Sequence, residues 1–228
     1  NTVFASFLAV GSVSWLYYAD RLIEFPVGVL GVALSTVLLP SLSRSLANNK
    51  KYEYSSLINW GIKLGILTAA PASAALVILS IPLITTLFFY GAFQETDVLM
   101  THNALIAYSV GLIGLIQIKI IAPAFYAQQN VKTPVKIAIF TLFCTQFMNL
   151  IFIGIFQHAG LALAIGLGAC INAGLLFFFL QKSKLFKLDS NIFKFIIKVL
   201  VSAGIMSAVL FYFKGSTEDW LNYSAISR

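Results

Sequence analysis

Apolar residues occupy most of the chain in long stretches that short polar connections separate. A helix needs about 20 predominantly apolar residues to cross the hydrocarbon core of a bilayer. On this criterion we expect seven membrane-crossing segments, at roughly 1–24, 27–46, 62–90, 103–127, 134–156, 160–181 and 192–213, with the first one incomplete. Strands of a membrane barrel would instead form alternating segments of about ten residues. The pattern therefore predicts an all-α polytopic membrane protein.

The composition excludes a single soluble domain. Hydrophobic residues make up 59% of the chain and charged residues 10%, whereas a soluble domain carries about 25% charged residues. Cys144 and Cys170 both lie in apolar runs without CxxC spacing, which predicts neither a disulfide nor a metal framework. The sequence offers no catalytic serine and no phosphate-binding loop. We therefore expect neither an enzyme nor a bound cofactor.

The first apolar stretch has no basic region before it and no small-residue cleavage site. We therefore do not expect a signal peptide. A chain that opens inside an apolar stretch and closes on a polar tail is typical of a fragment of a longer polypeptide.

Basic residues gather at alternate connections, where acidic residues are rare. They are Arg44, Lys50, Lys51, Lys63, Lys132, Lys136, Lys182, Lys184, Lys187, Lys194 and Lys198. Positive residues mark the cytoplasmic side of a membrane protein, so these connections are expected in the cytoplasm. We expect a helix bundle over 1–181, then a cytoplasmic linker, a further membrane helix at 192–213 and an outward-facing tail within 182–228. A nucleic-acid partner is not expected, because no soluble basic domain is present.

A cluster of charge lies within the first apolar segments. Asp20, Arg21 and Glu24 share one arc of a helix with Tyr17, because each residue turns a helix by about 100°. A charge near the bilayer centre costs about 2.5–3.5 kcal/mol on insertion scales, so a retained arginine indicates a cavity or a partner. The guanidinium fork matches the oxygens of a phosphate.

Pro26, Gly28 and Gly31 predict a break directly after this cluster. The next helix would then begin near Arg21, and its positive dipole end would favour an anionic ligand. In a second interpretation, Arg21 pairs with Glu24 at the outer interface and holds a helical hairpin shut. The residues alone leave both interpretations open.

Polar residues also occur in the later segments. Lys119 can extend its ammonium group toward the cytoplasmic interface or form a structural pair, and it can also line a cavity. Gln146 and Asn149 accompany a stripe of threonines, Thr141 and Thr145. Such residues hydrogen-bond between helices at about 0.6 kcal/mol each, and the alternative is coordination of an ion.

Four sequence blocks carry a family resemblance. They are "YYADRLIEFPVGVLGVALSTVLLPSLSRS", "GLIGLI", "KIIAPAFYAQQNVKTPVKIAI" and "TQFMNLIFIG", in one order over about 210 residues. The chain resembles the MurJ (MviN) family of the MOP superfamily, the lipid II flippases of peptidoglycan biosynthesis. The resemblance implies the second lobe of a transporter with fourteen membrane helices in the bacterial inner membrane. The first lobe of the same polypeptide and membrane lipids would be its structural partners.

The resemblance also implies a function and a site. Family members move undecaprenyl-diphosphate-linked muropeptide from the inner to the outer leaflet by alternating access. Arg21 matches the family's functional arginine and would bind the diphosphate, while Asp20, Glu24 and Tyr17 would complete the substrate site and its outer gate. Lys119, Gln146 and Asn149 are the expected cavity-lining residues. The resemblance also implies that some members bind sodium through acidic and amide side chains, whereas this chain offers Gln146 and Asn149 without a carboxylate. Sodium, protons or the membrane potential could drive transport.

Two further classes of function stay open at this level. One is a related exporter of drugs or of another polyprenyl-linked oligosaccharide. The other is a membrane scaffold that recruits cell-wall machinery without transport, for which Arg21 would be dispensable.

Overall fold

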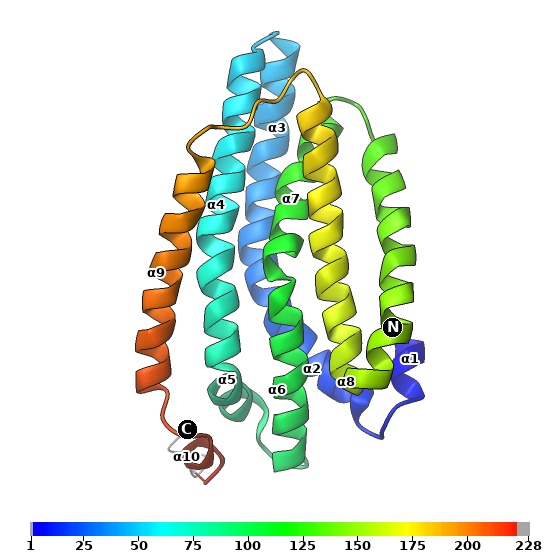
Figure 1. The fold of residues 1–228 in the computed structure, drawn as a ribbon, viewed down its shortest axis with the longest axis vertical. Coiled ribbons are helices and arrows are strands. Elements are labelled where there is room, and N and C mark those ends of the chain that lie inside the picture. Colours follow the sequence, from blue (N-terminus) through cyan, green and yellow to red (C-terminus); the bar gives the residue numbers. More distant parts are fainter. Residues whose placement is uncertain (1, 223–228) are drawn as a thin grey trace.

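The computed structural model describes residues 2–222, and every regular element in this range is a helix (Figure 1). The elements are α1 (Thr2–Ser6), α2 (Ser12–Pro26), the π-helix η1 (Val27–Val32), α3 (Ala33–Ala47), α4 (Lys51–Ile78), α5 (Ser80–Phe88), α6 (Glu95–Val110), α7 (Leu112–Ala127), α8 (Lys132–Lys182), α9 (Ile192–Phe213) and α10 (Thr217–Asn222). The long helices stand side by side in an upright bundle, as an all-α polytopic membrane protein requires.

The apolar helices are long enough for six membrane crossings within the described residues. Four stretches qualify alone, at 12–47, 51–78, 132–182 and 192–213, and α6 with α7 forms a fifth crossing bent by 41°. The longest of these helices, α8, contains two arms, because Gln157 has the non-helical angles φ 52 and ψ −128. The arms at 132–156 and 158–182 run back along each other (Figure 1), so α8 crosses twice.

The expected break at Pro26 is wrong. Residues 12–47 form one continuous helical run in which α2, η1 and α3 follow each other directly. Proline clashes with the carbonyl four residues earlier in a regular helix, and the wider π-helical turn that follows Pro26 accommodates this local distortion. The turn in this region lies earlier, at Gly11, whose φ of 102° is in the left-handed region that glycine readily adopts.

The continuous helix changes the number of membrane crossings and the argument for anion binding. The segments expected at 1–24 and 27–46 make one crossing, so the described residues cross six times rather than seven. Because no helix begins beside Arg21, no helix dipole acts on a ligand there. Arg21 also lies within this helical run and not at its end.

The basic connections all lie at one end of the bundle, the upper end in Figure 1. The turn from α3 to α4, the turn from α7 to α8 and the linker from α8 to α9 meet there, while α5, α10 and the bend of α8 lie at the other end. This arrangement is the one that the charge pattern requires. The cytoplasmic position of the upper end stays a prediction, and the tail beyond residue 222 lies outside the described residues.

Helix α7 occupies the interior and packs against α3, α4 and α8. Its side chains Leu112, Ile116 and Ile120 are almost completely buried. Small residues bring α8 still closer, because a Cβ atom added at Gly111 would lie 2.1 Å from the Cα of Gly166. Backbones in this kind of contact are typical of helix packing in membranes.

Candidate functional site

The charged face of α2 has the composition that the spacing predicted. The Nη1 atom of Arg21 donates to Oε2 of Glu24 at 2.6 Å, and the guanidinium lies 4.7 Å from the ring centroid of Tyr17. Residues three and four positions apart are neighbours on a helix, which explains both contacts. The side chains of Arg21 and Glu24 are 52% and 56% exposed, so the pair is accessible to a ligand.

Asp20 precedes Glu24 by one helical turn, so it lies on the same arc of α2 as this pair. It is half-buried and borders a cavity of about 330 Å³ together with Tyr17, Leu16, Tyr108 and Ile165. The cavity therefore lies where α2 meets α6 and the second arm of α8. Tyr17 is the residue that touches both regions, since its ring also lies under Arg21.

An apolar cavity lies on the other side of Arg21. It has a volume of about 710 Å³ and is bordered by α2 and η1 on one wall and by α4 and α5 on the other. We call it the α2–α4 pocket, and its lining includes Leu22, Phe25, Val29, Ala75, Leu76 and Phe88. Of the described residues that line it, only Arg21 is charged. Arg21 thus stands on the boundary between a polar helix face and an apolar pocket.

The chemistry available at this boundary is anion binding by a guanidinium. Arginine offers five N–H donors in a planar fork, and Glu24 accepts from one of the terminal nitrogens. Asp20 and Glu24 are both acidic, and Glu24 already occupies one guanidinium nitrogen, so it competes with an anionic ligand for Arg21. Within residues 2–222, no group of three or more His, Cys, Asp or Glu side chains is placed to hold a metal ion.

Lys119 lies on α7, away from both cavities. Its side chain is exposed, and its stem packs over Gly31 of η1, where an added Cβ atom would lie 3.2 Å from its Cγ. No ion pair involves Lys119 in the part of the chain that the structure describes. An exposed ammonium on a packed stem is the geometry of the snorkelling interpretation, and a cavity-lining role stays a prediction.

Gln146 and Asn149 lie in the first arm of α8. Asn149 is fully buried, and its Nδ2 donates to Oε1 of Gln146 at 3.2 Å. One turn away, Thr145 packs against Gly168 of the second arm, where an added Cβ atom would lie 2.2 Å from the threonine Oγ1. These residues lie within or beside the contact between the two arms. Neither amide borders the two cavities described above.

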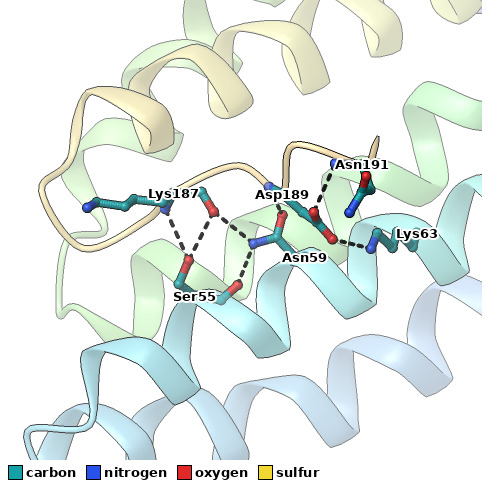
Figure 2. Close-up of polar contacts among 6 residues, drawn as sticks. All are labelled: Ser55, Asn59, Lys63, Lys187, Asp189 and Asn191. Atoms are coloured by element: carbon teal, nitrogen blue, oxygen red, sulfur yellow. Dashed lines mark hydrogen bonds and ion pairs between the residues drawn. The ribbon is translucent and has the colours of Figure 1, made fainter. Parts of the chain in front are cut away.

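A polar cluster that was not predicted from the sequence holds the linker before α9 (Figure 2). Ser55 donates to the carbonyl of Lys187 at 3.1 Å and accepts from its amide at 3.0 Å. Asn59 donates to the same carbonyl at 2.8 Å and accepts from the amide of Asp189 at 3.0 Å. The carboxylate of Asp189 forms an ion pair with Lys63. We call Ser55, Asn59 and Lys63 the linker clamp.

The linker clamp had a signal in the sequence. Its three residues are spaced by four, so they share one stripe of α4 and all face the linker. Asp189 also accepts from the backbone N–H of Asn191 at 2.9 Å, just before α9 begins. The hydrogen bond from Lys63 and the one from Asn191 hold the pKa of Asp189 below its ordinary value.

A second missed cluster joins three helices at the opposite end of the bundle. The indole of Trp15 donates to Oδ1 of Asp97 at 2.7 Å, while Oδ2 accepts from the backbone of Gln94 at 2.8 Å and caps α6. The ring of His158 lies 5.1 Å from that of Trp15 and shares a hydrogen bond of 2.9 Å with the carbonyl of Met100. The start of α2, the start of α6 and the bend of α8 therefore meet here.

Comparisons with known proteins agree over nearly the whole chain. The family described as Lipid II flippase MurJ matches residues 1–228. The chain is 47% identical over 225 residues to the "Lipid II flippase MurJ" of Burkholderia cenocepacia, with 99% of this chain and 43% of the relative covered. It is 46% identical over 220 residues to the "Probable lipid II flippase MurJ" of Buchnera aphidicola subsp. Schizaphis graminum, covering 96% and 43%.

A solved structure gives the same result for the fold. The structure of "Lipid II flippase MurJ, inward closed conformation" superposes with a TM-score of 0.82 and 29% identity, over 96% of this chain and 45% of the other. The chain spans less than half the length of the curated relatives it matches. Because the family matches from the first residue to the last, the chain belongs to the MurJ family of lipid II flippases.

Proposed function

We propose that the protein containing this chain moves lipid II, the undecaprenyl-diphosphate-linked muropeptide, from the inner to the outer leaflet of the bacterial inner membrane. The observation that carries the proposal is the position of Arg21. Its side chain is more than half exposed inside a membrane-crossing run, at the boundary between a polar face and an apolar pocket. A lipid diphosphate needs such a boundary, because it joins an anionic group to a hydrocarbon chain.

In the proposed mechanism, the diphosphate takes the place of the Glu24 carboxylate on Arg21. The ion pair between Arg21 and Glu24 is exposed, and solvent screening makes exposed pairs of this kind weak. A bidentate contact with a phosphate is stronger, so exchange is favourable when the ligand arrives. Glu24 and Asp20 would contribute to closing the outer side when the site is empty.

The helix that carries Arg21 can also bend. The π-helical turn from Val27 to Val32 directly follows Pro26, and π-helical turns inside α-helices are frequent at functional sites. An added Cβ atom at Gly28 would meet no atom within 4 Å, which leaves space for the turn to move. We propose that α2 changes its angle to α3 during alternating access. No covalent bond changes in this process, so the protein acts as a transporter, driven by sodium, protons or the membrane potential.

The proposal is tested by complementation with the full-length parent protein. Cells depleted of their own flippase would express Arg21→Ala, Arg21→Lys or wild type at matched membrane levels. We expect alanine to abolish growth and lysine to rescue poorly, because an ammonium group cannot form the planar two-point contact. The control is Arg44→Ala, which removes an exposed arginine near the end of α3. Normal growth of Arg21→Ala would refute the proposed site.

A growth assay alone does not distinguish a transporter from a scaffold that recruits cell-wall machinery. A direct readout is the fraction of lipid II that a membrane-impermeant cleaving enzyme can reach from outside. We expect this fraction to fall in Arg21→Ala and to match the wild type in Arg44→Ala. A scaffold without transport activity would leave the fraction unchanged in both variants.

A further inference from the structure

The α2–α4 pocket is an unassigned cavity within the membrane-crossing part of the chain. Eleven of its twelve described lining residues are apolar, and the twelfth is Arg21. Its volume of about 710 Å³ falls in the range of roughly 300–1,000 Å³ that small-molecule sites occupy. The pocket is therefore large enough for a short hydrocarbon chain.

The pocket has a buried wall and an open side. Leu76 of α4 and Pro26 of α2 are buried and form part of its inner wall. Phe25, Val29 and Leu87 border it as well, but more than half of each side chain is exposed. A flexible chain can thus enter from the side, between α2 and α5.

Because Arg21 is the only polar side chain among the described lining residues, the pocket restricts the kind of ligand that it can bind. The lining side chains apart from Arg21 are leucine, phenylalanine, proline, valine and alanine, and none of them can donate or accept a hydrogen bond. In a glycerophospholipid, a glycerol unit with two ester groups separates the phosphate from the hydrocarbon. Those esters would lie in the pocket without partners, and burying such a group costs roughly 1–3 kcal/mol. In a polyprenyl diphosphate, the first hydrocarbon unit is bonded directly to the phosphate oxygen.

We propose that the α2–α4 pocket binds the isoprene units of a polyprenyl diphosphate that lie nearest to its phosphate, while Arg21 holds that phosphate. This inference rests on the proposed function and adds a chain-binding subsite to it. The phosphate lies at the mouth, where Arg21 meets the polar face of α2. The first units of the chain then lie between Leu22, Phe25 and Phe88, and the rest of the chain leaves through the open side.

The test uses the full-length protein and two probes. The first is a polyprenyl diphosphate that carries a photoreactive diazirine on a proximal isoprene unit, and the second is inorganic diphosphate, which has no chain. Ala75→Phe fills the pocket from α4, and Ala138→Phe makes the same change at an exposed position of α8. Protein fold is monitored by the thermal unfolding midpoint of each variant in detergent.

We expect the diazirine to label peptides of α2–η1 and α5 in the wild type and in Ala138→Phe. In Ala75→Phe, the affinity for the prenyl probe should fall about tenfold, the equivalent of losing the burial of about two methylene groups. The affinity for inorganic diphosphate should stay the same, because Arg21 is unchanged. An excess of phosphatidylglycerol should not displace the label.

Each contrary result has a distinct meaning. Equal labelling in Ala75→Phe and the wild type, or displacement by phosphatidylglycerol, would overturn the chain subsite and leave the proposed function intact. In the second case the pocket would be an acyl-chain site for membrane lipids. If Arg21→Ala binds inorganic diphosphate as tightly as the wild type, the phosphate site at Arg21 is refuted, and the proposed function that rests on it is refuted as well. If Ala75→Phe lowers the unfolding midpoint, Leu76→Ala, which enlarges the pocket, replaces it and should shift the label along the chain.

Discussion

Lys63 and Asp189 form an ion pair although 126 residues separate them in the sequence. The pair joins α4 to the linker before α9, and Ser55 and Asn59 bind the same linker through its backbone (Figure 2). Helix α9 stands at the edge of the bundle beside α4 (Figure 1). Few of its side chains are buried, among them Val199 and Ala203. The polar contacts at the linker therefore hold the chain in place just before α9 begins.

Removing Asn59 should loosen the attachment of α9. Asn59→Ala deletes two hydrogen bonds to the linker, each worth about 0.5–1.5 kcal/mol. The expected result is a broader distance distribution between spin labels at the exposed positions Leu67 of α4 and Ile197 of α9, measured by electron paramagnetic resonance. Asn103→Ala, at an exposed asparagine of α6, is the control. Identical distributions in Asn59→Ala and the wild type would show that apolar packing alone positions α9.

The linker clamp should withstand mild acid. Hydrogen bonds from Lys63 and from the backbone of Asn191 lower the pKa of Asp189, so the carboxylate stays ionised below the ordinary value of about 3.9. A lowered pKa contributes stability that is complete above the ordinary value and is lost as the pH falls through the folded-state value. The spin-label distance should therefore be constant from pH 7 to about pH 5 and change only below about pH 4. A change between pH 5 and pH 7 would contradict this assignment, and Asp189→Asn should remove the acid transition.

The sequence predicted the class of fold because membrane crossing depends on apolar length, which can be read residue by residue. The gathering of basic residues such as Arg44 and Lys132 at one end of the bundle could be predicted in the same way, residue by residue. The contact between Arg21 and Glu24 was also within reach, because a helix of any length places residues three apart side by side. Local spacing therefore carried most of the correct predictions.

The sequence could not show how Pro26 is accommodated. A proline followed by Gly28 and Gly31 is compatible with a hairpin turn and with a π-helical turn in a continuous helix, and only packing against the neighbours selects one. The clamp at Asn59 was missed for a similar reason, since its partners are backbone atoms of a distant linker. The cavity that Asp20 borders was not predictable either, because it depends on where α6 and α8 pack.

Glycines at helix contacts should differ sharply from glycines on open faces. A Cβ atom at Gly111 would lie 2.1 Å from a backbone atom of Gly166, whereas one at Gly154 would meet nothing within 4 Å. Gly111→Ala should therefore destabilise the fold by about 1–3 kcal/mol through overpacking. Gly154→Ala should be neutral or stabilising, because alanine is the better helix former by about 1 kcal/mol. Thermal unfolding in detergent measures both, and equal midpoints would contradict the close packing of α7 and α8.

Neutralising Glu24 should strengthen anion binding at Arg21. Glu24→Gln removes the competing carboxylate that holds Nη1 at 2.6 Å, and the change should be small because both side chains are more than half exposed. Because exposed ion pairs are weak, we expect the affinity for inorganic diphosphate to rise by no more than about fivefold. Isothermal titration calorimetry on the full-length protein in detergent is the measurement.

The chain contains a matched control for this experiment. Lys50 and Glu53 form a pair with the same spacing at 3.1 Å, and their side chains are 62% and 50% exposed. Glu53→Gln frees a cation at the far end of the bundle from Arg21 and removes the same charge, so it reports any effect of net charge alone. A gain in Glu24→Gln that Glu53→Gln does not reproduce places the anion at Arg21. Equal gains would mean that diphosphate responds to total charge, and Arg21 would then be a structural partner of Glu24 and Tyr17.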